Sequence, residues 1–250
     1  MPIAGGHNHV VVRGHSVDRL DDRVAFGHGQ SAPGAEVVLD VHHHESVGHC
    51  PNIVRGVIRR TGVTDELRQV LLTPEQAISL DVRGTTDAAV LVPLYVEGGE
   101  LHAVFTKRRE DLRRHPGEIS FPGGRRDAAD SDLLATALRE AEEEVGLPSD
   151  AVEVVGALQP TPTIATSYAV YPFVGVIAPG FEWTPSAREV ALVIELPLMA
   201  LLAGYGRRRL VRRGLPIRTD TYLVGDHLIW GATARILADL FDRIGPLAGG

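Results

Sequence analysis

The chain has 250 residues, 44% of them hydrophobic, and a formal net charge of −7 at pH 7. This composition indicates a globular domain with a full core, and since no apolar run approaches about eighteen residues we expect no membrane span. An acidic balance argues against nucleic-acid binding, which normally shows as an excess of basic residues. The single cysteine, Cys50, excludes an internal disulfide and favours a cytoplasmic location.

The first part of the chain differs in composition from the rest. Eight of the 11 histidines lie within residues 1–50, in a stretch without helical or strand periodicity. Imidazole and thiolate are suitable transition-metal ligands, but the spacing matches no zinc pattern for His42, His43, His44, His49 and Cys50. We expect residues 1–62 to be either a disordered His-rich extension or an artefact of an upstream start codon, with one domain at 63–250.

From residue 64 onward the pattern is that of an α/β domain. Residues 65–72 read as a short helix. A second helix is expected to begin at Pro74, because Thr73 suits the N-cap, proline suits the first helical position and Gln76 completes a capping box.

A β-hairpin and a glycine-containing loop follow. The apolar runs 88–96 and 101–107 are joined by Glu97-Gly98-Gly99-Glu100, which favours a tight turn. Residues 117–124 are expected to form a loop in which paired glycines allow close backbone approach to a ligand.

The second half of the chain predicts further strands and two amphipathic helices. The first helix spans 133–145 and is expected to end at a left-handed Gly146. Its predicted buried stripe is Leu134, Ala137, Leu138 and Ala141. Strands are expected at 152–158, 170–177 and 221–228. The closing helix spans 230–244, with Ile236, Leu237, Leu240 and Phe241 facing inward.

The helix at 133–145 carries clustered acids. Glu140, Glu143 and Glu144 stand at i, i+3 and i+4 and share one face, whereas Glu142 points away. Such crowding is tolerated if a cation sits among the carboxylates, and hard oxygen ligands favour Mg²⁺ or Mn²⁺. The alternative is a solvated acidic face, which is the usual role of such runs.

The surrounding pattern resembles the Nudix box. Gly124 is followed by fourteen residues and then by Arg-Glu-x-x-Glu-Glu-x-Gly-Leu, starting at Arg139. The usual box is one residue shorter, and its first glutamate has no clean counterpart here. Asp130, Ser131 and Asp132 fall near that place, and we assign them only loop or helix-start structure. The resemblance implies an α/β/α sandwich with a mixed β-sheet and a loop–helix–loop catalytic motif.

The same resemblance implies roles for individual residues. Glu140, Glu143 and Glu144 would be metal ligands or the water-activating base, with Gly124 offering its carbonyl to the metal. Arg139 would orient a glutamate through a bidentate ion pair. A second candidate base is Glu189, for which a surface position in a loop is an equally good interpretation.

A narrower resemblance is to the coenzyme A pyrophosphatase branch of that family. It is carried by Phe105-Thr106-x-Arg108, Arg113, Gly117 and Phe121-Pro122-Gly123-Gly124. In the C-terminal half it is carried by Glu189-Val190, Pro197-Leu198 and Ile229-Trp230-Gly231-Ala232-Thr233, so that it covers roughly residues 64–245. Two departures concern substrate identity: Arg109 replaces a small residue, and Thr166-Ser167-Tyr168 replaces Ser-Gly-Phe.

This branch implies hydrolysis of the diphosphate of coenzyme A or acyl-CoA to 3′,5′-ADP and (acyl-)phosphopantetheine. Arg108, Arg113, Gly123 and Gly124 would then bind the substrate. The alternatives are hydrolysis of other nucleoside diphosphate derivatives, such as ADP-ribose and dinucleoside polyphosphates, and a non-catalytic ligand-sensing module. Such modules typically lose the metal carboxylates, which this chain retains. A homodimer is also implied as possible, since Nudix relatives are often dimers.

Overall fold

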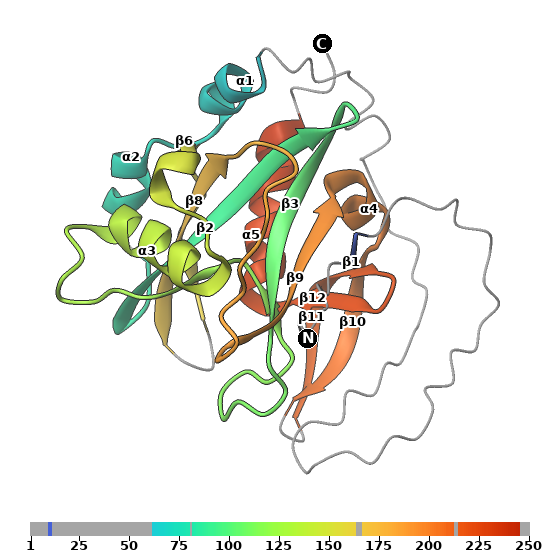
Figure 1. Cartoon of the computed structure of the whole chain (residues 1–250). Helices are drawn as coiled ribbons and strands as arrows, with labels where there is room; N and C mark the ends of the chain where they lie inside the picture. The colour runs from blue at the N-terminus through green and yellow to red at the C-terminus, as the bar shows by residue number, and fades with distance from the viewer. Residues whose placement is uncertain (1–9, 12–61, 81, 164–166, 213–214, 246–250) are drawn as a thin grey trace, which may run out of the picture.

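A mixed β-sheet forms the centre of the computed structural model, which describes residues 10–11, 62–80, 82–163, 167–212 and 215–245 (Figure 1). In spatial order its main strands are β1 (Val10–Val11), β9 (Val190–Pro197), β3 (Glu100–Arg108), β2 (Thr86–Glu97), β8 (Tyr168–Val176) and β6 (Glu153–Ala157). Three short strands add to it: β4 (Ile119–Ser120) on β3, β5 (Gly123–Arg125) on β2, and β7 (Thr161–Pro162) on β8. The β2–β8 and β1–β9 pairs are parallel, and the other pairs are antiparallel.

A second sheet and several helices complete the described part of the chain. The second sheet is antiparallel and consists of β10 (Tyr205–Arg212), β11 (Leu215–Val224) and β12 (His227–Trp230). The α-helices are α1 (Val63–Val70), α2 (Pro74–Ser79), α3 (Leu133–Val145), α4 (Leu198–Ala203) and α5 (Gly231–Ile244), and a 3₁₀ turn, η1, spans Ser149–Ala151.

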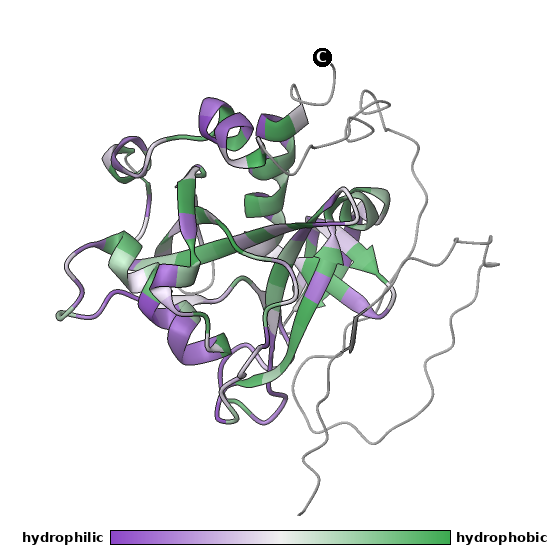
Figure 2. Ribbon diagram, turned by 45° about the horizontal axis from the view of Figure 1, so that its top comes forward, coloured by the Kyte–Doolittle hydropathy of each residue, from purple (hydrophilic) through white to green (hydrophobic). Residues whose placement is uncertain are grey.

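The large sheet is covered by helices on both faces. Strand β2 sends Val92, Leu94 and Val96 into a core shared with α5, whereas Leu91 and Tyr95 pack in a second core with α3. Figure 1 shows α3 and α5 on opposite sides of the sheet, and the hydropathy colouring of Figure 2 shows mostly hydrophobic residues along the central strands. The predicted α/β/α architecture with a mixed sheet is confirmed.

The hairpin and the first helices agree with the sequence patterns. Glu97 pairs with Glu100, so the β2–β3 turn contains only Gly98 and Gly99, whose φ angles of 62° and 85° are left-handed. The capping box of α2 is present, with the Thr73 hydroxyl accepting from the Gln76 N–H. Helix α1 starts two residues earlier than predicted and ends at residue 70, because residue 72 forms a bridge to the strand region at 157.

Helix α3 has the predicted bounds, and Gly146 ends it in the left-handed conformation with φ 73°. Its buried stripe is rotated from the prediction: Ala137 and Ala141 are buried, but the predicted Leu134 and Leu138 are only partly buried. Helix α5 matches the prediction to within one residue, and all four predicted inward residues are buried.

Two predictions in the later part of the chain need correction. The expected loop at 117–124 contains β4 and the start of β5, because its backbone pairs with β3 and β2. The expected strand at 221–228 is two strands, β11 and β12, separated by a turn at Gly225, whose φ of 56° breaks the extended conformation. Strand β9 and helix α4 were not predicted. The strands at 152–158 and 170–177 correspond to β6 and β8.

The predictions for residues 1–62 lie outside the described residues, apart from Gly62 and the β1 strand, which pairs with Ile194 and Glu195 of β9. Thr166 also lies outside them. Among the helices that the structure describes, none is long and apolar enough to cross a membrane.

Candidate active site

The acidic face of α3 lies directly against the glycine strand β5. The Gly123 N–H donates a hydrogen bond of 3.1 Å to Glu144 Oε2. A Cβ atom on Gly124 would stand 2.5 Å from the carboxyl carbon of Glu140. A side chain at Gly124 would therefore displace the Glu140 carboxylate from β5, and the expected approach of this backbone to a ligand stays a prediction.

The helix fixes the direction of the acids. Asp132 caps its first turn by accepting a 2.8 Å hydrogen bond from the Ala135 N–H. The side chain of Glu144 is only 8% exposed, that of Glu140 is 18% exposed and that of Glu143 is 61% exposed, so the three acids run from the interior toward solvent. Glu142 is exposed, as predicted.

Arg139 makes its bidentate ion pair with Asp130, whereas a glutamate was the expected partner. Its Nε and Nη2 lie 2.8 and 3.1 Å from the two Asp130 oxygens. The same guanidinium reaches Glu140 Oε1 at 3.0 Å and Glu143 Oε2 at 3.2 Å with single contacts. Arg139 therefore links the loop before α3 to two of the acids.

Asp130 is a site residue that the sequence patterns did not reveal beyond its place near the missing first glutamate. Its side chain is 4% exposed and also accepts from the Thr136 hydroxyl at 2.9 Å and the Asp127 N–H at 2.8 Å. The Arg139 guanidinium, helped by these two donors, holds the pKa of the Asp130 carboxyl far below its usual range. The position of Asp130 before Arg139 could have identified it from the sequence only if an aspartate were allowed in place of the first glutamate of the Nudix box.

This lowered pKa predicts a specific pH dependence of stability. The Asp130 pair stabilises the fold fully above the unfolded-state pKa of about 3.8, and this contribution is lost as the pH falls through the lower folded-state pKa. Asp130→Asn should therefore be less stable than wild type at pH 7, and the difference should shrink below about pH 4. Urea unfolding of both proteins from pH 7 down to about pH 2, which enters the window below the unfolded-state pKa, measures it. A difference independent of pH would contradict the assignment.

Arg108, the last residue of β3, lies close to the acids of α3. The register of β3 against β9 shifts between Lys107 and Arg108, and the Arg108 side chain is 25% exposed. Its Nη1 lies 3.7 Å from Glu144 Oε1 and 3.5 Å from Glu189 Oε2. The Nε atom is buried without a hydrogen-bond partner in the part of the chain that the structure describes. Glu189, 52% exposed, thus faces the acids of α3 across Arg108.

The structure does not bring every candidate to this place. Arg113 is exposed in the loop between β3 and β4 and makes no ion pair among the described residues. His115 lies in the same loop and contacts Glu118 at 2.6 Å. The arginines of β10 lie in the second sheet, where Arg207 pairs with Asp220 at 3.4 Å.

The buried acids carry unfavourable negative charge. Burial raises the pKa of Glu144 to about 7, with further raising by Glu140 and Glu189, against lowering by the Gly123 N–H and Arg108. Burial also raises the pKa of Glu140, which Arg139 partly offsets. A cation among these carboxylates would relieve this cost.

The residues fit a hard divalent cation by their chemistry. Glu140, Glu143 and Glu144 offer only oxygen donors, and Gly124 leaves their approach open. Within the described ranges no three acidic, histidine or cysteine side chains converge as a metal cluster. Arg139 contacts Glu140 and Glu143, and Arg108 contacts Glu144. A bound cation would therefore take contacts that these arginines now make.

Comparison with known proteins places this geometry in a family. A NUDIX domain matches residues 85–203. The chain is 40% identical over 177 residues to a protein of Enterobacter sp. (strain 638) named "Uncharacterized Nudix hydrolase NudL", covering 70% of this chain and 90% of the relative. The protein of that name from Salmonella heidelberg (strain SL476) is 41% identical over the same coverage. A MutT/nudix family protein from Enterococcus faecalis shows 13% identity and a TM-score of 0.45, covering 66% of this chain and 64% of that chain.

The matched NUDIX domain, the NudL relatives and the acid-bearing loop–helix–loop indicate a hydrolase of phosphorus-containing anhydrides, that is, a pyrophosphatase. The chain belongs to the Nudix hydrolase family. Members of this family generally use divalent metals such as Mg²⁺.

Proposed function

We propose that the protein hydrolyses the diphosphate of coenzyme A or acyl-CoA to 3′,5′-ADP and (acyl-)phosphopantetheine, using Mg²⁺ or Mn²⁺. The observation that carries this proposal is the position of Arg108, the arginine of the Phe-Thr-x-Arg motif, between Glu144 and Glu189. The Gly123-Gly124 pair of the same resemblance lies against the acids. A cytoplasmic location, a nucleotide-like substrate and a possible homodimer stay predictions.

Glu140, Glu143 and Glu144, together with the Gly124 carbonyl, would hold the metal. When bound, the metal supplies charge neutralisation on the phosphates and a more acidic water. Arg139 keeps Glu140 and Glu143 on the same side of α3, and its own orientation is set by Asp130. The protein thus preorganises its acids before substrate arrives.

Arg108 suits binding of a substrate phosphate. Its guanidinium presents several donors in one plane, and its Nε has no hydrogen-bond partner among the described residues. Arg113, in the loop beyond β3, is the second candidate for phosphate contact. In this assignment both arginines act by charge and by two-point hydrogen bonding.

A carboxylate not saturated by metal would accept the proton of the attacking water. Glu140 and Glu189 are the two candidates. Glu189 is half exposed and therefore accessible to water, whereas Glu140 is mostly buried beside Gly124. The water oxygen bonds to one phosphorus, the bridging oxygen leaves with the other phosphate, and the proton passes to the carboxylate.

Product analysis tests the substrate. Purified protein with Mn²⁺ and CoA should release 3′,5′-ADP and phosphopantetheine in equal amounts, as measured by liquid chromatography and mass spectrometry. ADP-ribose and a dinucleoside polyphosphate form the comparison panel, because Arg109 departs from the branch pattern. A higher kcat/KM for either of these than for CoA would overturn the substrate assignment. Binding without turnover of any diphosphate would indicate a ligand-sensing module instead.

A further inference from the structure

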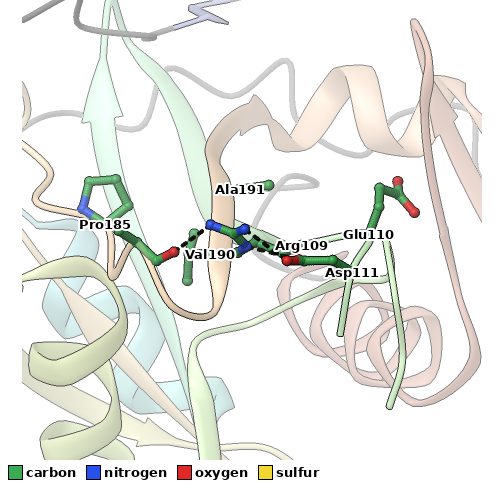
Figure 3. Close-up of a pocket in the computed structure, with 7 residues that line it drawn as sticks. Arg109, Glu110, Asp111, Pro185, Val190 and Ala191 are labelled. Carbon is green, nitrogen blue, oxygen red and sulfur yellow. Dashed lines mark hydrogen bonds and ion pairs between the residues drawn. The ribbon is translucent and has the colours of Figure 1, made fainter. Parts of the chain in front are cut away.

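Arg109 stands beside the active site in an open pocket of about 620 Å³. The pocket is lined by Arg109, Glu110, Asp111, Pro185, Ala187, Val190 and Ala191. Figure 3 shows the Arg109 guanidinium spanning it, with hydrogen bonds on both sides. It joins the loop after β3 to the turn before β9, two segments about eighty residues apart in the sequence.

That turn carries Glu189. It begins at Ser186, whose N–H donates to the Glu144 carbonyl at 2.8 Å and whose carbonyl accepts from the N–H groups of Glu189 and Val190 at 3.1 and 2.9 Å. The Arg109 N–H donates to the Glu189 carbonyl at 3.0 Å. The backbone of the turn is therefore held by α3 at one end and by Arg109 at the other.

The Arg109 side chain adds a third attachment. Its Nη1 donates to the Ala187 carbonyl at 2.7 Å. Its Nε and Nη2 donate to the two carboxylate oxygens of Asp111 at 2.9 and 2.8 Å. Because the guanidinium is planar, the pairing with Asp111 fixes the direction of the remaining donor toward Ala187.

The exposure of this pair limits what it can contribute. The side chains of Arg109 and Asp111 are 41% and 65% exposed. Exposed ion pairs contribute little to global stability. The bonds to the turn instead connect the segment that carries Glu189 to the loop after β3.

We propose that Arg109, oriented by Asp111, is a positioning residue that holds the 186–189 turn so that Glu189 faces the acids of α3. This inference rests on the proposed hydrolysis, in which Glu189 takes part. Without the side-chain bond to Ala187, Glu189 would sample other positions, and small displacements of a reacting group reduce turnover strongly.

Four single variants test the proposal. Arg109→Ala removes the attachment, Arg109→Lys keeps the charge without the planar fork, and Asp111→Asn weakens the orientation of Arg109. Glu110→Gln is the matched control, since Glu110 lies in the same loop, is 72% exposed and pairs with Lys107 instead. We expect kcat to fall about 10- to 100-fold in both Arg109 variants, with KM changed less than about threefold. The kcat of Asp111→Asn should lie between those of the Arg109 variants and that of Glu110→Gln, which should match wild type.

Two further readouts separate positioning from a general structural effect. Hydrogen exchange should accelerate at the amides of residues 186–190 in Arg109→Ala and stay at the wild-type rate in α3 and α5. In a Glu189→Gln background, Arg109→Ala should lower kcat by less than about threefold, because a residue that acts through Glu189 has no further effect once Glu189 is changed.

The results that would overturn the positioning role of Arg109 differ from the results that would overturn the proposed function. Wild-type exchange rates in Arg109→Ala, or an equal loss of kcat in both backgrounds, would overturn the positioning role. Full turnover by Arg109→Lys would also overturn it, since charge alone would then suffice. If wild type cleaves no diphosphate, the proposed function fails, and with it the positioning role that depends on Glu189 taking part in hydrolysis. If wild type turns over normally and the Arg109 variants are unaffected, only the positioning role is overturned.

Discussion

Replacing Glu144 by glutamine is expected to lower kcat by more than about 100-fold, a larger loss than an outer partner of a metal site usually causes. Glu144 is the most buried of the three acids, and it touches both Gly123 and Arg108. Loss of its charge removes a metal ligand in our assignment. The affinity for Mn²⁺, measured by titration calorimetry on the protein without substrate, should fall with it.

The fold should tolerate this change. A buried neutral amide costs less than a buried carboxylate, so we expect the melting temperature to stay within about 4 °C of wild type. Glu142→Gln on the same helix is the control, because Glu142 is exposed and points away from the other acids. If Glu144→Gln keeps wild-type turnover and Mn²⁺ affinity in a folded protein, the metal assignment is wrong.

Local patterns predicted the elements in which neighbouring residues determine the structure. The bounds of α3 follow from its apolar period and from Gly146, and the start of α2 follows from Thr73, Pro74 and Gln76. The hairpin follows from the glycines between β2 and β3. In each case a capping side chain or a left-handed glycine marks where the element begins or ends, and that signal lies within a few residues of the sequence.

Elements and contacts that depend on distant partners were less predictable. The loop at 117–124 becomes two strands only because β2 and β3 offer free backbone groups. The pairing of Arg108 with Glu189 joins strands distant in sequence. The split between β11 and β12 had a local signal, Gly225 followed by Asp226, which lies inside the predicted strand.

Asp130 shows a different limit of sequence patterns. A shorter carboxylate at a shifted position does not match the motif, yet it reaches Arg139 with both oxygens. What identifies it is its burial and its partners Thr136 and Asp127, which only the folded chain brings together. The network of Asp130 and Arg139 therefore leads to a prediction that the motif alone does not contain.

Arg139→Gln should lose both stability and activity. The Asp130 side chain, 4% exposed, would become a buried charge without its cation, which typically costs about 3–5 kcal/mol. This corresponds to a decrease in melting temperature of roughly 10 °C for a domain of this size. Turnover should fall as well, because Glu140 and Glu143 lose the guanidinium that holds them at 3.0 and 3.2 Å.

The double variant Asp130→Asn/Arg139→Gln separates these two effects. Removing both charges eliminates the buried unpaired carboxylate, so most of the lost melting temperature should return. Turnover should stay low, since no guanidinium then orients Glu140 and Glu143 on α3. Calorimetry and steady-state kinetics on both variants measure this. A double variant as unstable as Arg139→Gln would show that Arg139 stabilises the fold through contacts other than Asp130, and recovered turnover would show that Arg139 does not organise the acids.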